Sequence, residues 1–144
     1  MIQKVDTSHI PAAAVLASRL WPGQSQAAFE EEFASLLTDS RSSLFLSFQE
    51  AKAVGFAQCQ LRQDYVEGTD SSPVGYLEGI YVLPEHRHQG HAKALLAACE
   101  EWARSCGCRE FASDCPLENT QSLSFHMHTG FYEANRIICF VKKL

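Results

Sequence analysis

The stretch "LPEHRHQGHAKALL" at residues 83–96 decides the fold of this chain, because a strand ends and a long helix begins within it. An apolar run, "VGYLEGIYVL" at 74–83, precedes it and is typical of a strand. The following residues place apolar side chains on one stripe, which predicts a helix that ends at Gly107: Ala92, Leu95, Leu96, Cys99, Trp102, Ala103 and Cys106. The next segment, "REFASD" at 109–114, completes a β–α–β unit, in which two parallel strands flank a right-handed crossover.

The rest of the chain carries the patterns of shorter elements. Two apolar runs, at 43–48 and 53–61, are joined by a hairpin-sized turn, so an antiparallel pair is expected. The full prediction is a short strand at 2–5, helices near 13–20 and 29–37, the hairpin, a polar loop at 62–73, the β–α–β unit, a helix at 119–128 and a final strand at 130–143. This order, βααββ–βαβαβ, predicts an α/β fold with one mixed sheet and helices packed on it, in a single domain spanning 1–144.

The composition restricts the class of partner. The chain has 12 Lys and Arg against 17 Asp and Glu, and its net charge of −5 argues against a nucleic-acid binder. The same acidity suits a small cationic partner, although mild acidity also serves solubility alone. No apolar run approaches the roughly 20 residues that span a bilayer. The segment "IPAAAVLA" at 10–17 resembles the core of a signal peptide, but it follows Asp6 and not a basic cluster. The protein is therefore expected in the cytoplasm, away from membranes.

The cysteines and histidines raise the questions of disulfide bonds and of a metal site. The six cysteines, at 59, 99, 106, 108, 115 and 139, have no framework-like spacing and lie mostly within apolar patterns. Reduced, mostly buried thiols are therefore expected. His86, His88 and His91 lack a second cluster of ligands at metal spacing, so no metal is expected.

The start of the long helix is a candidate anion site. The strand ends at Leu83, and residues 87–92 then lie at the helix N-terminus, where backbone N–H groups lack partners and the helix dipole is positive. Gly90 lets a ligand approach the backbone, while Arg87 and Lys93 add charge. These features favour a phosphate group, although an ordinary helix start with surface bases has the same local chemistry. The stretch is neither a Walker loop nor a G-x-G-x-x-G motif.

The same residues carry a resemblance to a known family. They match R-x-x-G-x-A, from Arg87 to Ala92, and "ENTQSLSFHMHTGF" at 118–131 supplies a downstream N-x6-H…GF segment. In these motifs and in its element order, the whole chain resembles the GNAT superfamily of acyl-CoA-dependent N-acetyltransferases. Three further segments resemble the aminoglycoside 6'-N-acetyltransferases: "LWPG" at 20–23, "DYVEGTDSSPVGYLEGIYVLPEHR" at 64–87 and "CREFASDCPLENT" at 108–120. The resemblance implies acetyl transfer from acetyl-CoA to the 6'-amine of an aminoglycoside of the kanamycin or tobramycin type, and hence antibiotic resistance.

The resemblance also assigns an acetyl-CoA site. It places the pyrophosphate at the helix start, on Arg87, Gln89, Gly90, His91, Ala92 and Lys93. It places the pantetheine arm along Ile80, Tyr81 and Val82, where the arm pairs like an added strand. Gly79, an isolated glycine in a strand, is expected to mark a bulge that splays this strand from "REFASD" and opens a slot for the thioester. Asn119 matches a residue that binds pantetheine, and it equally suits a helix N-cap.

Acetyl transfer to an amine makes three chemical demands. The ammonium must lose a proton, the developing oxyanion needs a donor such as a backbone N–H in 80–82, and the leaving thiolate benefits from a proton. Asp114 matches the acid most often given the catalytic role, and Glu78 matches a substrate-binding acid. Each also suits a strand-end carboxylate in a salt bridge. His126 stands where many members have a tyrosine, and it suits either protonation of the thiolate or packing.

A polycationic sugar needs acids, hydroxyls and a flat surface around it. Trp21, Tyr65, Glu78 and Asp114 match substrate-contacting positions, although Trp21 equally suits the closing of a core at a helix end. Asn135 stands where some relatives carry a substrate-binding glutamate, which removes one charge. Glu133, two residues away, would face the same side of a regular strand and replace it. Relatives in this branch are usually dimers, so a homodimer is expected.

Two other functions fit the same chain. One keeps the fold and changes the acceptor to a polyamine or another small cationic amine. The other is an acyl-CoA-binding sensor that has lost catalysis. The pair Glu78 and Asp114 argues against the sensor, and the long branch-specific segments argue against the polyamine.

Overall fold

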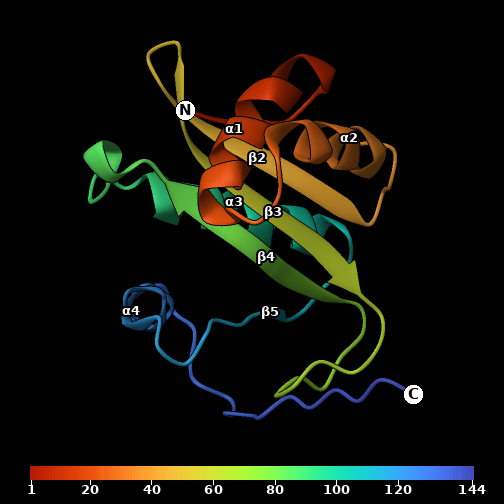
Figure 1. Ribbon diagram of the computed structural model, residues 1–144. Coiled ribbons are helices and arrows are strands. Elements are labelled where there is room, and N and C mark those ends of the chain that lie inside the picture. The colour runs from red at the N-terminus through yellow and green to blue at the C-terminus, as the bar shows by residue number, and fades with distance from the viewer.

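The computed structural model, which describes residues 1–144, contains one five-stranded sheet in the order β1-β2-β3-β4-β5 (Figure 1). Its strands are β1 (Ile2–Lys4), β2 (Ser42–Gln49), β3 (Lys52–Arg62), β4 (Val74–Val82) and β5 (Phe111–Ser113). Strands β1 to β4 pair antiparallel with their neighbours, whereas β4 and β5 are parallel. The predicted hairpin, the mixed sheet and the parallel pair are confirmed.

Helices cover both faces of this sheet. On one face lie α1 (Ile10–Leu20) and α2 (Gln26–Leu36), and on the other lies α3 (His91–Ser105), which connects β4 to β5 (Figure 1). The last helix, α4 (Thr120–His128), follows β5, and short 3-10 turns cover Thr7–His9 and Pro84–His86. None of the helices is both long and apolar enough to cross a membrane.

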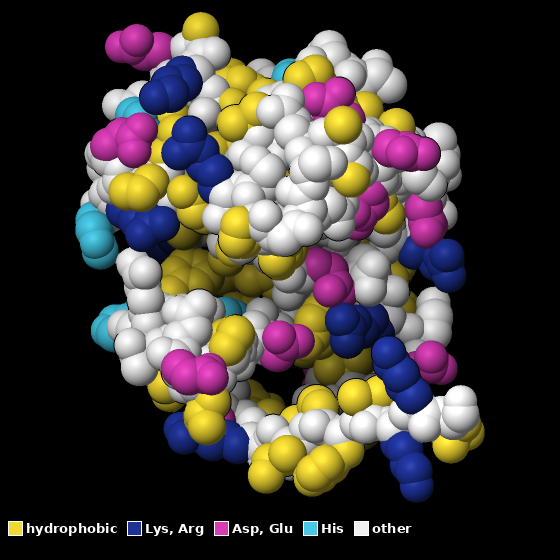
Figure 2. All heavy atoms as spheres, in the orientation of Figure 1, with side chains coloured by type: hydrophobic (Ala, Val, Ile, Leu, Met, Phe, Trp, Pro, Cys, Tyr) yellow, Lys and Arg dark blue, Asp and Glu magenta, His cyan; other side chains and the backbone are white.

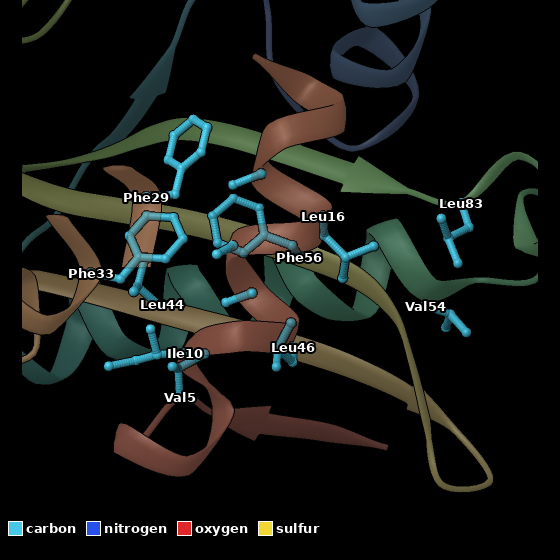
Figure 3. Close-up of a cluster of buried hydrophobic side chains, with 13 residues drawn as sticks. Val5, Ile10, Leu16, Phe29, Phe33, Leu44, Leu46, Val54, Phe56 and Leu83 are labelled. Atoms are coloured by element: carbon cyan, nitrogen blue, oxygen red, sulfur yellow. The ribbon is translucent and has the colours of Figure 1, made fainter. Parts of the chain in front are cut away.

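Apolar clusters on the two faces hold these layers together. On the α1 and α2 face, Phe29 and Phe33 lie one helical turn apart and pack their rings 5.6 Å apart, with Phe56 of β3 a further 5.5 Å from Phe33 (Figure 3). On the other face, Leu95 and Leu96 of α3 are buried against the sheet. Burial of one such side chain contributes about 1.5–3 kcal/mol, so both helix layers fix the position of β4 between them.

All six cysteines are unpaired, as predicted. Cys59, Cys99 and Cys108 are buried, and the exposed one is Cys139 near the C-terminus. Cys59 of β3 and Cys99 of α3 lie in the same buried cluster, where the Cys99 thiol and burial raise the pKa of the Cys59 thiol. These two thiols therefore pack as small apolar side chains.

The C-terminal segment departs from the prediction. Residues 132–144 are all exposed and form neither helix nor strand, so the predicted final strand at 130–143 is wrong for this chain. A strand needs a neighbour for its backbone N–H and C=O groups, and β5 pairs with no segment beyond β4. This tail runs along one end of the molecule (Figure 1) and exposes a series of large apolar side chains: Tyr132, Ile137, Ile138, Phe140, Val141 and Leu144.

Candidate active site

A β-bulge in β4 lies at the centre of the candidate site. Gln58 pairs with Gly79 and Cys59 pairs with Leu77, so Glu78 is the additional residue on the bulged strand. The ladder between β4 and β5 ends at Leu77 and Ser113. Beyond that point, the β4 edge from Gly79 to Val82 has no paired strand beside it. The bulge expected from Gly79 is confirmed, and β4 and β5 part next to it.

Trp21, the residue after α1, covers Gly79. A Cβ at position 79 would lie 2.4 Å from Cζ2 and 2.6 Å from Cη2 of the indole, so a glycine is required for Trp21 to lie here. The indole also stacks on Phe29, with ring centroids 5.8 Å apart. Trp21 therefore closes the core at the helix end, and it also borders a cavity of about 280 Å³ whose other lining residues are Gln24, Phe29, Glu32, Gln58 and Glu78.

Both predicted acids belong to one polar network on this face. Arg62 Nη2 donates to the two carboxylate oxygens of Glu78, at 3.0 and 3.3 Å. The Arg62 guanidinium carbon lies 3.4 Å from the centroid of the Tyr76 ring, and the Tyr76 hydroxyl donates to Asp114 Oδ2. Burial, together with the hydrogen bond to Asp114, raises the pKa of Tyr76 and keeps the phenol a proton donor. Figure 2 shows acidic and basic side chains around the hollow between the body and the tail.

The remaining predicted acceptor residues lie on the loop and the tail. Tyr65 is 76% exposed in the loop that joins β3 to β4. Asn135 Nδ2 donates to Glu67 Oε1 of the same loop at 3.0 Å, so the tail and the loop are in contact. Glu133 is instead paired with Arg136. Glu133 was expected to face the same side of a regular strand as Asn135. The tail is not a strand, so this expectation is wrong.

The helix start at the end of β4 has the backbone shape that the sequence suggested. Gly90 is the residue before α3 and has a φ of 90°, while His88 has a φ of 60°. Two left-handed residues so close together turn the chain sharply from β4 into α3. Gln89, Gly90 and Lys93 are exposed, and Arg87 Nε donates to the carbonyl of Val82 at 3.0 Å. No three His, Cys, Asp or Glu side chains gather closely enough to hold a metal ion.

His91 is held against the sheet at the first turn of α3. Its Nδ1 lies 2.8 Å from Ser47 Oγ of β2, and the ring of His86 is 6.3 Å away. Burial and the nearby His86 lower the pKa of His91. The imidazole therefore remains neutral at a helix end that disfavours positive charge.

His126 lies on the opposite face of the sheet from the two acids. Its Nδ1 is 2.7 Å from the carbonyl oxygen of Ser122, which only accepts, so the neutral ring carries its proton on Nδ1. Nε2 then accepts from Ser113 Oγ at 2.8 Å. Asn119 Oδ1 accepts from the Ser122 N–H at 3.1 Å, which makes Asn119 the N-cap of α4, one of the two roles considered for it.

The predicted residues thus fall into separate places. Glu78 and Trp21 line one cavity near the bulge, and Asp114 is linked to Glu78 through Tyr76 and Arg62, whereas Tyr65 and Asn135 lie on the loop and the tail. Sequence reasoning missed five residues that the fold brings to this face: Gln24, Glu32, Gln58, Arg62 and Tyr76. Glu32 had no local signal, because it shares a cavity with Glu78 only in the folded chain. Arg62 and Tyr76 had no local signal, because they meet the acids only through strand register.

A mixed sheet that opens beside a bulged strand, next to a glycine-led helix start, agrees with the fold that the resemblance to acyl-CoA-dependent N-acetyltransferases implied. The model of the acetyltransferase (GNAT) family matches residues 10–131, and the chain belongs to this family. The predicted fold class and the predicted enzyme class are confirmed.

Similar proteins cover nearly the whole chain. An aminoglycoside N(6')-acetyltransferase type 1 from Salmonella typhimurium strain LT2 is 40% identical over 142 residues, which span 99% of this chain and 98% of that protein. A protein of the same name from Stenotrophomonas maltophilia is 41% identical over 140 residues, spanning 96% and 90%. The structure of AAC(6')-Iy in complex with the bisubstrate analogue CoA-S-monomethyl-acetylneamine is similar with a TM-score of 0.96 at 40% identity, covering 100% of this chain and 98% of that one.

Proposed function

We propose that this protein transfers the acetyl group of acetyl-CoA to the 6'-amino group of aminoglycosides and so confers resistance to them. The observation that carries the proposal is the similarity over the full chain to AAC(6')-Iy, which binds a CoA-linked neamine derivative in its structure. Glu78 and Asp114, which a cationic acceptor requires, lie on one face beside the parted strands. The chain acts as a single domain, which is supported by two cores sharing one sheet.

The cofactor side of the proposal uses the helix start and the free strand edge. Backbone N–H groups at the first turn of α3 bind the pyrophosphate, with charge from exposed Lys93. The pantetheine arm pairs with the edge of β4 at Ile80, Tyr81 and Val82, which no strand of this chain occupies. Asn119 uses Oδ1 as the helix cap, and its Nδ2 donates to the pantetheine.

The acceptor side of the proposal uses the polar face near α1. Glu78 and Asp114 bind the ammonium groups, and Trp21 supplies a flat wall for the sugar. Tyr65 and Asn135 contact the more distant rings from the loop and the tail. Asn135 carries no charge but is bonded to Glu67, so that carboxylate supplies the negative charge at this end of the site.

The register of β4 and β5 separates the two proton transfers. The acceptor ammonium gives one proton to Asp114, and the new C–N bond forms as the C–S bond breaks. The nitrogen then loses its second proton to water, and the thiolate takes one proton. Tyr76 and Asp114 are bonded on the α1 face, whereas Ser113 is bonded to His126 on the other face. Neutral His126 has no proton on Nε2, so it donates as the imidazolium, with the Ser113 hydroxyl between it and the thiolate.

The test of the proposed function is an acceptor panel. Purified protein with acetyl-CoA should release free thiol with kanamycin or tobramycin and not with spermidine. An aminoglycoside with a hydroxyl in place of the 6'-amine is the matched acceptor control and should give no thiol. Thiol release with spermidine alone would overturn the proposal, and acetyl-CoA binding without turnover on any amine would identify a sensor instead.

The C-terminal tail supports a homodimer, in which a second copy covers its apolar side chains. Ile138 is 80% exposed and Phe140 is 90% exposed, and such a run is a typical association surface. The substitutions Ile138→Asp and Phe140→Asp together should give a monomer in sedimentation, whereas Lys142→Asp and Lys143→Asp in the same tail should not. A monomeric wild-type protein would contradict the dimer. Six unpaired thiols are in keeping with action in the reducing cytoplasm.

A further inference from the structure

Asp114 stands where the sheet no longer fixes the chain. The last paired residue of β5 is Ser113, and Asp114 follows it as an exposed residue. Its backbone belongs to no ladder, so the sheet does not determine where its carboxylate points. A proton acceptor that is free to rotate loses much of its rate advantage, because small displacements of a reacting group are costly. Some other contact must therefore set the position of this side chain.

The Tyr76 hydroxyl is that contact. Tyr76 is 6% exposed, and it comes from the middle of β4, where the ladders with both β3 and β5 hold its backbone. Its hydroxyl donates to Asp114 Oδ2 and leaves Oδ1 to accept a proton from an acceptor amine. A rigid strand residue thus reaches across to a carboxylate on the less rigid chain beyond β5.

Arg62 fixes the Tyr76 ring from the other side. Its guanidinium carbon lies over the ring, 3.4 Å from the centroid, and Nη2 of the same group donates to Glu78 Oε1 at 3.0 Å. The Arg62 side chain is 38% exposed and that of Glu78 is 22% exposed, so this pair is only partly screened by solvent. Arg62 therefore helps to hold the ring in place, and with it the position of the hydroxyl oxygen.

We propose that Tyr76 is a positioning residue, which holds Asp114 as the proton acceptor through its hydroxyl while Arg62 holds the ring. The proposal rests on the proposed function for the role of Asp114, and on the contacts above for the role of Tyr76. It assigns to the reaction two residues that do not themselves touch the reacting atoms.

The decisive experiment is a double-mutant cycle with Tyr76→Phe and Asp114→Ala. Tyr76→Phe keeps the ring beneath Arg62 and removes the hydroxyl. We expect kcat with kanamycin to fall about 10- to 100-fold, with the KM for acetyl-CoA unchanged. In the Asp114→Ala background, the same substitution should change kcat less than twofold, because Tyr76 then has nothing to position. Losses that multiply in the double variant would overturn the proposal.

Two controls separate this proposal from simpler failures. Tyr132→Phe removes the hydroxyl of an exposed tyrosine in the tail and should leave kcat unchanged. The same cycle read by chemical unfolding should show non-additive shifts of the midpoint, and additive shifts would show that Tyr76 does not hold Asp114. If the wild-type protein acetylates no aminoglycoside, the proposed function fails, and the unfolding cycle still decides whether the two side chains are coupled.

Discussion

The helix start at 84–93 and the polar network around Tyr76 lie at two places along β4, and the chain builds them in different ways. The helix start is contiguous in sequence, and its shape comes from a 3-10 turn and the left-handed residues His88 and Gly90. The network takes Arg62 from β3, Tyr76 and Glu78 from β4, and Asp114 from beyond β5. The first site follows from local conformation, and the second depends on register and on one bulge. Substitutions in the two regions should therefore fail in different ways.

The largest effect should come from removing the proton acceptor. We expect Asp114→Asn to lower kcat with kanamycin about 10²- to 10⁴-fold, because an amide does not accept the proton of the ammonium. The KM for acetyl-CoA should change little, since the helix start is untouched. Steady-state thiol release across a range of pH measures both quantities.

The control for this variant removes an acid elsewhere. Glu31→Gln deletes one exposed carboxylate of α2 and should leave kcat unchanged, which separates proton transfer from loss of overall charge. Circular dichroism should show Asp114→Asn folded like the wild type. Wild-type rates for Asp114→Asn at every pH would remove Asp114 from the mechanism.

A second substitution breaks the architecture of the same region. Gly79→Ala places a Cβ 2.4 Å from the Trp21 indole, so the ring or the strand must shift. We expect a loss of about 1–3 kcal/mol in the free energy of unfolding, typical of overpacking, together with a higher KM for kanamycin. Gly23→Ala, where an added Cβ meets nothing within 4 Å, is the matched control and should be nearly neutral. Equal stability of the two variants would show that Trp21 is not confined by Gly79.

The same contrast explains what the sequence predicted well. The β–α–β unit, the buried stripe of α3 and the bulge at Gly79 all come from patterns within a few residues of each other. The family motifs placed Glu78 and Asp114 near the parted strands. They did not reveal Arg62 or Tyr76, because an arginine after an apolar run and a tyrosine within a strand have no local pattern that links them to an acid. The final strand was predicted from the residues at 130–143 alone, and these residues do not supply a neighbouring strand.

At the start of α3, backbone strain and acetyl-CoA binding should be separable by substitutions at the two ends of the helix. Gly90→Ala and Gly107→Ala each place an alanine at a φ near +90° at one end of α3, and neither Cβ meets an atom within 4 Å. Both should lose about 1 kcal/mol of stability for the left-handed conformation. We expect a several-fold higher KM for acetyl-CoA in Gly90→Ala and an unchanged KM in Gly107→Ala. Equal KM values in the two variants would contradict a cofactor site at the start of α3.

The smallest effect should be the pH dependence that His91 contributes to stability. Because the pKa of His91 is lowered from 6.5 by burial and by His86, the unfolded chain takes up this proton at a higher pH than the folded protein. The stability that neutral His91 contributes is therefore fully present above about pH 6.5, and it is lost as the pH falls through the lower pKa of the folded protein.

The variant His91→Gln tests this contribution, because it keeps a hydrogen-bonding group near Ser47 and cannot take up a proton. Its unfolding midpoint should fall less between about pH 7 and pH 5 than that of the wild type. An identical fall in the two proteins would mean that His91 is not held neutral at the helix start.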